Sequence, residues 1–130
     1  MKKRFLIAVE LTGLGLAVFF AFNYFRRGMD SAEVIRKLQG IRMAVELFHQ
    51  AQGRLPADIA ELLQDGTLEA VPELKLKRHP AAFRIRNAAG PGLLDTGSWA
   101  YVNDPASAAF GTVFIDCAHQ DEKGRYWSWF

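Results

Sequence analysis

Hydrophobic residues crowd into the start of the chain. From Phe5 to Phe25 the sequence is apolar except for Glu10 and a few uncharged polar residues. At about 1.5 Å per residue, this stretch would form a helix of roughly 31 Å, close to the ~30 Å hydrocarbon thickness of a membrane. It is flanked by basic residues, which are Lys2, Lys3 and Arg4 before it and Arg26 and Arg27 after it. We therefore predict a basic flank over residues 1–4 and a membrane-spanning helix over residues 5–27.

A second hydrophobic pattern follows Gly28. Asp30–Glu33 (D-S-A-E) has the form of a capping box, and Gly53 is placed as a helix stop. Between them, apolar residues recur at alternating spacings of four and three, at Val34, Leu38, Ile41, Val45 and Phe48. This stripe predicts an amphipathic helix over residues 30–52 that packs on the protein's own sheet. If the two helices are continuous they form a rod of roughly 70 Å, with Gly28 and Gly40 as the places where it could bend.

The rest of the chain reads as short elements separated by turns. Pro56–Leu63 has the pattern of a short helix, and the segments with strand patterns are Ala82–Asn87, Ser98–Val102, Gly111–Asp116 and the aromatic Tyr126–Phe130. Helices followed by a meander of strands favour an α+β class. We therefore predict a long N-terminal helix, membrane-spanning in its first half, that packs on a small antiparallel sheet, and a globular domain over residues 28–130 that includes the amphipathic helix.

Charge and cysteine content narrow the class of protein. The 130 residues carry 16 basic and 14 acidic side chains, so the net charge of +2 does not indicate a nucleic-acid partner. The single cysteine, Cys117, excludes an intrachain disulfide.

The apolar stretch from Phe5 to Phe25 is longer than the roughly 7–15 residues of a cleaved signal core and lacks an A-x-A site, which favours a retained anchor. The basic N-terminal flank favours a cytoplasmic N-terminus and an exported, periplasmic C-terminal domain.

The order of these features resembles the type IV pilins and the type II secretion pseudopilins. The resemblance rests on an apolar helix that begins at Phe5 and bears Glu10, and on three later segments, which are His49–Pro56 (H-Q-A-Q-G-R-L-P), Gly97–Val102 (G-S-W-A-Y-V) and Gly111–Asp116 (G-T-V-F-I-D). It implies a bacterial inner-membrane protein whose N-terminal helix packs into a helical fibre. Its implied partners are other pilin-like subunits and the inner-membrane assembly machinery, with no nucleic acid and no small-molecule substrate.

The resemblance also implies a role for Glu10. In the family, a glutamate near the start of the mature helix pairs with the N-terminal amine of a neighbouring subunit, and Glu10 is the matching position. The family's processing junction would fall near Arg4, Phe5 and Leu6. Here Arg4 stands where the family has glycine, and Glu10 is the sixth residue counted from Phe5 rather than the fifth. The other interpretation is that Glu10 reaches the lipid headgroups of a plain anchor. In that case the protein is a membrane-anchored periplasmic adaptor or sensor that does not enter a fibre.

Candidate chemistry is sparse. The sequence has no H-E-x-x-H, G-x-S-x-G or P-loop motif, so we predict no enzymatic activity and no cofactor. His49, His79 and His119 lack metal-ligand spacing and are predicted to be ordinary polar residues, and Cys117 is predicted to be a half-buried thiol at a strand end. Calcium is a minor possibility, because it needs six to eight oxygens and the local candidates are only Asp116, Asp121 and Glu122.

Overall fold

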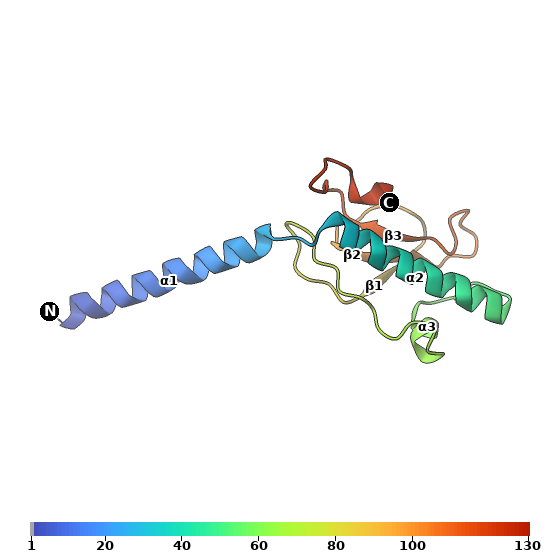
Figure 1. The fold of residues 1–130 in the computed structure, drawn as a ribbon, viewed down its shortest axis with the longest axis horizontal. Helices are drawn as coiled ribbons and strands as arrows, with labels where there is room; N and C mark the ends of the chain where they lie inside the picture. The colour runs from blue at the N-terminus through green and yellow to red at the C-terminus, as the bar shows by residue number, and fades with distance from the viewer. Residues whose placement is uncertain (1) are drawn as a thin grey trace.

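The computed structural model describes residues 2–130, with side chains described for residues 12–24 and 26–130. The elements are helices α1 (Lys2–Arg26), α2 (Ser31–Gln52) and α3 (Ala60–Gln64), strands β1 (Ile85–Ala88), β2 (Ser98–Val102) and β3 (Val113–Asp116), and the 3₁₀ turn η1 (Trp127–Trp129). α1 extends alone from a head formed by all the later elements (Figure 1).

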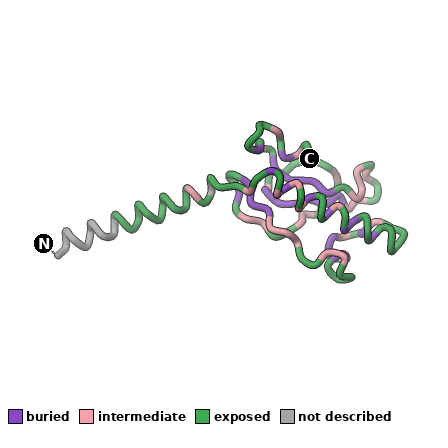
Figure 2. Tube along the Cα trace, viewed as in Figure 1, coloured by how far each residue is buried: buried purple, intermediate pink, exposed green. Residues whose placement is uncertain are grey.

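Helix α2 matches the predicted amphipathic helix. Asp30 caps its start by accepting a hydrogen bond from the Ala32 N–H, and Gly53 ends it with a φ of 69°. All five residues of the predicted stripe are buried, as the purple turns of the tube show (Figure 2). The prediction of an amphipathic helix packed on the sheet is therefore confirmed. The helix could be predicted because its capping residues and its apolar stripe all belong to one continuous segment.

The chain breaks between α1 and α2. The Met29 N–H donates to the Lys75 carbonyl at 2.7 Å, so the linker hydrogen bonds to another segment instead of continuing a helix. A Cβ on Gly28 would lie 2.9 Å from the Lys77 backbone nitrogen, so a side chain there would force the two segments apart. One continuous rod is therefore wrong, and the break falls at Gly28, one of the two glycines where a bend was expected, whereas α2 runs unbroken through Gly40.

The three-stranded sheet is mixed. Its order is β1-β2-β3, with β1 parallel to β2 and β2 antiparallel to β3. The predicted antiparallel sheet is wrong for the first pair, because the connection over residues 89–97 returns along the sheet before β2 begins. The closing aromatic segment is also not a strand, since it forms η1 with Trp127 buried and Trp129 70% exposed.

The main core lies between α2 and one face of the sheet. The α2 stripe packs with Trp99, Tyr101 and Ile115, and a smaller cluster around Ala100 and Phe114 forms elsewhere in the head. The polar tips of the two large aromatic residues are satisfied, because the Trp99 indole donates to a backbone carbonyl at 2.8 Å and the Tyr101 hydroxyl to another at 2.6 Å. This packing fixes the positions of the strand ends and of the loops that follow them.

The predicted membrane-spanning helix over residues 5–27 is wrong. Within the part of the chain that the structure describes, no helix is both long enough and apolar enough to cross a membrane. The single-pass inner-membrane location with a periplasmic domain, and the pilin-like fold class built on it, are corrected accordingly.

Candidate functional site

Helix α1 exposes hydrophobic side chains on every side. Successive residues on a helix point about 100° apart. Seven large hydrophobic side chains of α1 are 53–67% exposed and together point in directions all round the helix, at Leu14, Leu16, Val18, Phe19, Phe20, Phe22 and Tyr24. The tube of α1 is accordingly almost entirely green over its described length (Figure 2). A helix that is apolar all round normally packs inside a larger structure.

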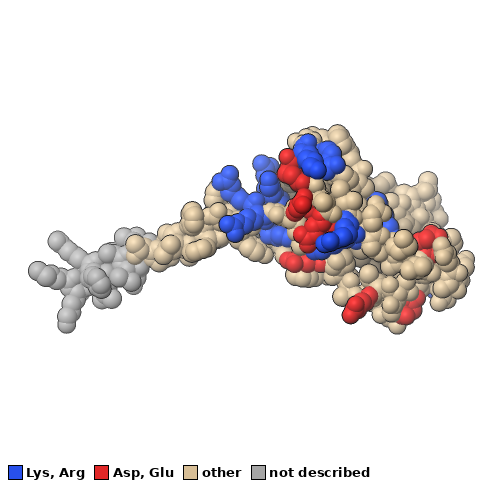
Figure 3. All heavy atoms as spheres, viewed as in Figure 1, with Lys and Arg blue, Asp and Glu red and all other residues tan. Residues whose placement is uncertain are grey.

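Cationic side chains border this apolar surface where α1 meets the head. Figure 3 shows Lys and Arg gathered at that junction. Arg26, Lys77 and Arg78 line a hollow there together with Phe22, and the Arg26 guanidinium lies 5.2 Å from the Phe22 ring centroid. The apolar surface therefore ends at a charged border where α1 meets the head.

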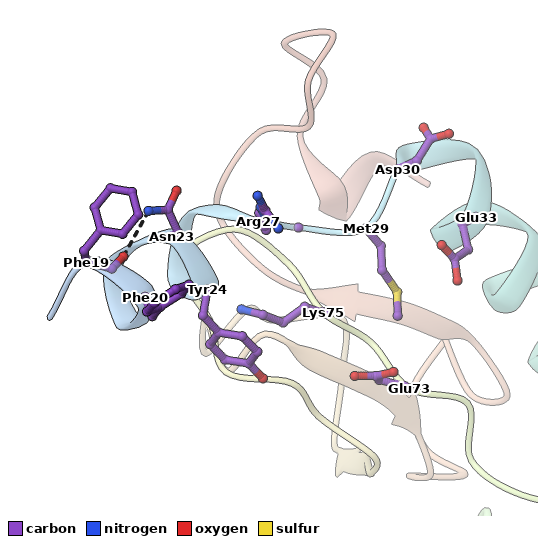
Figure 4. A pocket seen from close by; sticks show the side chains of 11 residues that line it. Phe19, Phe20, Asn23, Tyr24, Arg27, Met29, Asp30, Glu33, Glu73 and Lys75 are labelled. Carbon is purple, nitrogen blue, oxygen red and sulfur yellow. Dashed lines mark hydrogen bonds between the residues drawn. The ribbon is translucent and has the colours of Figure 1, made fainter. Parts of the chain in front are cut away.

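A groove of about 810 Å³ lies at the base of α1, between the helix and the segment that carries Lys75 (Figure 4). Phe19, Phe20 and Tyr24 line it from α1, and Met29 lines it from the linker. The Lys75 ammonium lies 4.5 Å from the Tyr24 ring centroid, and burial lowers the pKa of Lys75. The groove thus combines apolar side chains with two cations, Arg27 and Lys75, and three carboxylates, which are those of Asp30, Glu33 and Glu73.

The predicted assembly residues fall outside this region. Arg4, Phe5, Leu6 and Glu10 belong to α1 by their backbone, but their side chains lie outside the described residues. Their predicted roles in processing and subunit pairing therefore stay predictions.

The three carboxylates predicted as calcium candidates each contact a different part of the protein. Asp116 is fully buried and ion-paired with Arg86 at 3.0 Å. Asp121 pairs with Arg125 at 2.7 Å, and Glu122 accepts hydrogen bonds from the backbone and hydroxyl of Ser31 at the start of α2. Because each carboxylate already has its own donors, the structure does not assemble the three into one calcium site.

A different cluster lies in the head, and sequence reasoning missed it. The ligand atoms of His79, Asp95, Cys117 and His119 all lie within 4.8 Å of one another. His79 lies in the loop closed by an isolated β-bridge between residues 74 and 82, Asp95 lies in the β1–β2 connection, and Cys117 and His119 follow β3. The histidines were predicted to be unrelated polar residues and Cys117 to be half-buried. In the structure their side chains meet, and Cys117 is fully buried. Only the Cys-x-His spacing at residues 117–119 could have signalled this, whereas His49 stays apart and exposed on α2.

Asp116 and Gly97 position this cluster. The Asp116 carboxylate accepts hydrogen bonds from the Leu94 N–H at 2.7 Å and the Thr96 hydroxyl at 2.6 Å, which holds the loop carrying Asp95. Burial alone would raise the pKa of Asp116, but these donors and Arg86 outweigh it and hold that pKa below its ordinary value. Gly97 has a φ of 67°, and a Cβ there would lie 2.3 Å from the His79 Cγ, so only glycine lets the loop pass over that ring.

Comparison with protein-family models, with curated proteins and with solved structures returns no match. The resemblance to pilins therefore rests on the residue pattern alone. Function is inferred below from the exposed helix α1 and from the side-chain cluster in the head.

Proposed function

We propose that this protein is a non-catalytic structural subunit that assembles with other copies of itself through α1, as the resemblance to fibre-forming pilins implies. The observation that carries the proposal is the apolar surface around the whole described circumference of α1. Leaving such a surface in water is unfavourable by about 25 cal/mol for each Å² of apolar area. Helices that are apolar on all sides are stable when other elements enclose them.

The α1 helices of other copies are the occupant that fits this surface best. The partner has to present an apolar surface that is similarly long and straight. Within the described residues, α1 itself presents such a surface. The other large exposed hydrophobic side chains are spread over the head, at Met43, Leu47, Leu63, Phe83, Leu93, Leu94, Tyr126 and Trp129. Gly13 and Gly15 add to the match, because a Cβ at either would meet nothing within 4 Å and such small residues let helix backbones approach closely.

The charges in the sequence are consistent with a staggered arrangement of copies. Glu10 is the one acid in the apolar stretch, and Lys2, Lys3 and Arg4 precede it. A neighbouring copy displaced along the helix axis would bring its basic N-terminal end beside this carboxylate. In a helix bundle that excludes water, such a pair favours one stagger over others, because an unpaired charge there is costly. Under this proposal Glu10 sets the register between copies.

A second candidate is an adaptor that binds a different partner and does not enter a fibre. The groove at the base of α1 favours it, because a partner segment with an apolar side chain would contact Tyr24 and Met29 there. In that case the protein binds this partner through the groove, and the rest of α1 contributes less to the binding.

Two matched variants separate these functions. Phe20→Ser alters a side chain on α1 that is 67% exposed, and Phe83→Ser alters one on the head that is 65% exposed. Sedimentation velocity and negative-stain electron microscopy of the full chain should show large assemblies for the wild type and for Phe83→Ser. We expect Phe20→Ser, Leu16→Ser and, more strongly, the two combined to give smaller species. Phe20 also lines the groove whereas Leu16 does not, so the effect of Leu16→Ser separates assembly along α1 from binding at the groove.

The unmodified chain provides the decisive control. A monomeric wild type, or equal loss of assembly in Phe20→Ser and Phe83→Ser, would contradict assembly through α1. Circular dichroism checks that the head remains folded, which we expect because neither phenylalanine is part of the buried core.

A further inference from the structure

Four side chains of the head converge on one point, and this arrangement is independent of α1. The atoms are His79 Nε2, Asp95 Oδ1, Cys117 Sγ and His119 Nδ1. We propose that these four residues bind one zinc ion in tetrahedral coordination. The proposal goes beyond assembly, since it concerns what holds the head together.

The separations between these atoms are those of a zinc tetrahedron. Zinc bonds of 2.0–2.1 Å to nitrogen, about 2.0–2.2 Å to oxygen and about 2.3 Å to sulfur place nitrogen roughly 3.3–3.4 Å from another nitrogen or oxygen, and about 3.5–3.6 Å from sulfur. In the structure the two histidine nitrogens lie 3.2 Å apart, and they lie 3.3 and 3.4 Å from the Asp95 oxygen. Each lies 3.5 Å from the Cys117 sulfur. All five separations agree with the expected geometry.

Hydrogen bonding alone does not account for this arrangement. The Nε2 of His79 lies within 3.5 Å of the nitrogen of His119, the oxygen of Asp95 and the sulfur of Cys117. A ring nitrogen carries either one proton or one lone pair, directed along one line in the ring plane, so it can make one good hydrogen bond. The Nδ1 of His119 is crowded in the same way. A cation at the centre gives every one of these atoms a partner at once.

The donor set selects the metal. One thiolate, two imidazoles and one carboxylate are a combination that zinc binds, whereas calcium and magnesium require oxygen ligands. Four protein ligands also close the coordination sphere, which is the pattern of structural zinc sites rather than catalytic ones. Backbone N–H groups support the two anionic ligands, since that of Ala118 donates to Asp95 at 2.9 Å and that of His119 approaches the Cys117 sulfur at 3.4 Å.

The zinc site would join loops that the hydrogen bonds between paired strands do not connect. It links the segment around His79, the β1–β2 connection at Asp95 and the end of β3 at Cys117. Asp95 itself has a φ of 56°, and Arg78, next to His79, has a φ of 69°. Both values are unfavourable for residues other than glycine and occur where surrounding structure holds them in place. In a chain with a single cysteine, a metal can supply the cross-link that a disulfide cannot.

The test measures metal binding by the full chain, dispersed in a mild detergent because α1 is apolar. The chain is stripped with a chelator and refilled with zinc, or with cobalt as a spectroscopic probe. We expect one zinc per chain, an intense visible cobalt band of tetrahedral type and a near-ultraviolet sulfur-to-cobalt band. Cys117→Ser should abolish the sulfur band and weaken zinc binding by at least tenfold. His49→Ala changes a histidine outside the cluster and should leave both readouts unchanged.

A conservative second variant guards against misfolding. Asp95 is the most exposed of the four ligands, with 40% of its side chain accessible, so Asp95→Asn should fold and still bind zinc more weakly. Zinc should raise the Tm of the wild type more than that of Asp95→Asn. A folded wild type that takes up no zinc from a micromolar buffered supply would overturn the proposal. So would cobalt spectra of octahedral type, or equal loss of binding in Cys117→Ser and His49→Ala. None of these outcomes depends on whether the chain assembles through α1.

Discussion

The buried carboxylate of Asp116 gives the most direct test of how the head is held together. It is fully buried and accepts hydrogen bonds from the backbone N–H of Leu94 and of Asp95, from Thr96 and from the Arg86 guanidinium. Asp116→Ala removes all of these contacts together. The loop over residues 94–96 then loses its tie to the end of β3, and the guanidinium loses its counter-ion.

The expected loss of stability depends on how well Arg86 and the loop N–H groups are solvated once the Asp116 carboxylate is removed. Breaking a buried ion pair by deleting one partner costs about 3–5 kcal/mol. The Arg86 side chain is 21% exposed and regains some hydration, which favours the lower part of that range. The loop N–H groups can turn partly toward water, so they add little more. We therefore expect Asp116→Ala to lower the free energy of unfolding by about 3 kcal/mol, or the Tm by roughly 10 °C for a chain of this size.

Urea unfolding followed by tryptophan fluorescence measures this loss, because Trp99 lies in the core beside β3. Asp65→Ala is the matched control, since Asp65 is exposed and its carboxylate accepts one turn hydrogen bond, from the Thr67 N–H at 2.8 Å. That control should lose about 1 kcal/mol or less. A loss below about 1 kcal/mol for Asp116→Ala, or one equal to the control, would refute the view that this carboxylate organises the loop.

Three further changes test the core, a buried hydroxyl and the start of α2. Phe48→Ala should lower the free energy of unfolding by about 3–5 kcal/mol in urea, because the ring is buried in the main core; a loss under ~1.5 kcal/mol would contradict that packing. Tyr101→Phe should cost about 1–2 kcal/mol in the same assay, because it leaves the Pro56 carbonyl without its donor at 2.6 Å; an unchanged stability would mean that water replaces the hydroxyl. The hydrogen bond from Ser31 lowers the pKa of Glu122 below its ordinary 4.5, so its stabilisation is present above about pH 4.5 and is lost as the pH falls through the lowered pKa. Ser31→Ala should therefore lower the Tm at neutral pH by more than it does near pH 3, and a pH-independent difference would exclude this linkage.

Local signals made part of this fold predictable. Helix α2 carries its capping residue Asp30, its stop at Gly53 and its apolar stripe within one continuous segment. The strand β2 was predicted with its observed bounds, because Trp99 and Tyr101 sit in a short run bounded by turn residues. Gly28 was one of two glycines at which a bend was expected. In each case the physical cause lies within a few residues of the feature.

Other features depend on partners far along the chain. Whether β2 runs parallel or antiparallel to β1 depends on the path of residues 89–97, which Asp116 helps to hold through side-chain hydrogen bonds about twenty residues away in sequence. The side chains of His79 and His119 are forty residues apart and touch at 3.2 Å. The spacing of apolar residues cannot predict such a long-range contact, because it describes the burial of only one helix or strand at a time.

The sequence by itself therefore determined the amphipathic helix, its caps, the bounds of the central strand and the run of apolar residues at the start of the chain. Each follows from propensity, capping or burial of a single segment. The tertiary structure alone decided the mixed sheet, the separation of α1 from α2 and the convergence of His79, Asp95, Cys117 and His119. These result from packing and hydrogen bonds between distant segments, whose relative positions are set only when the core has formed.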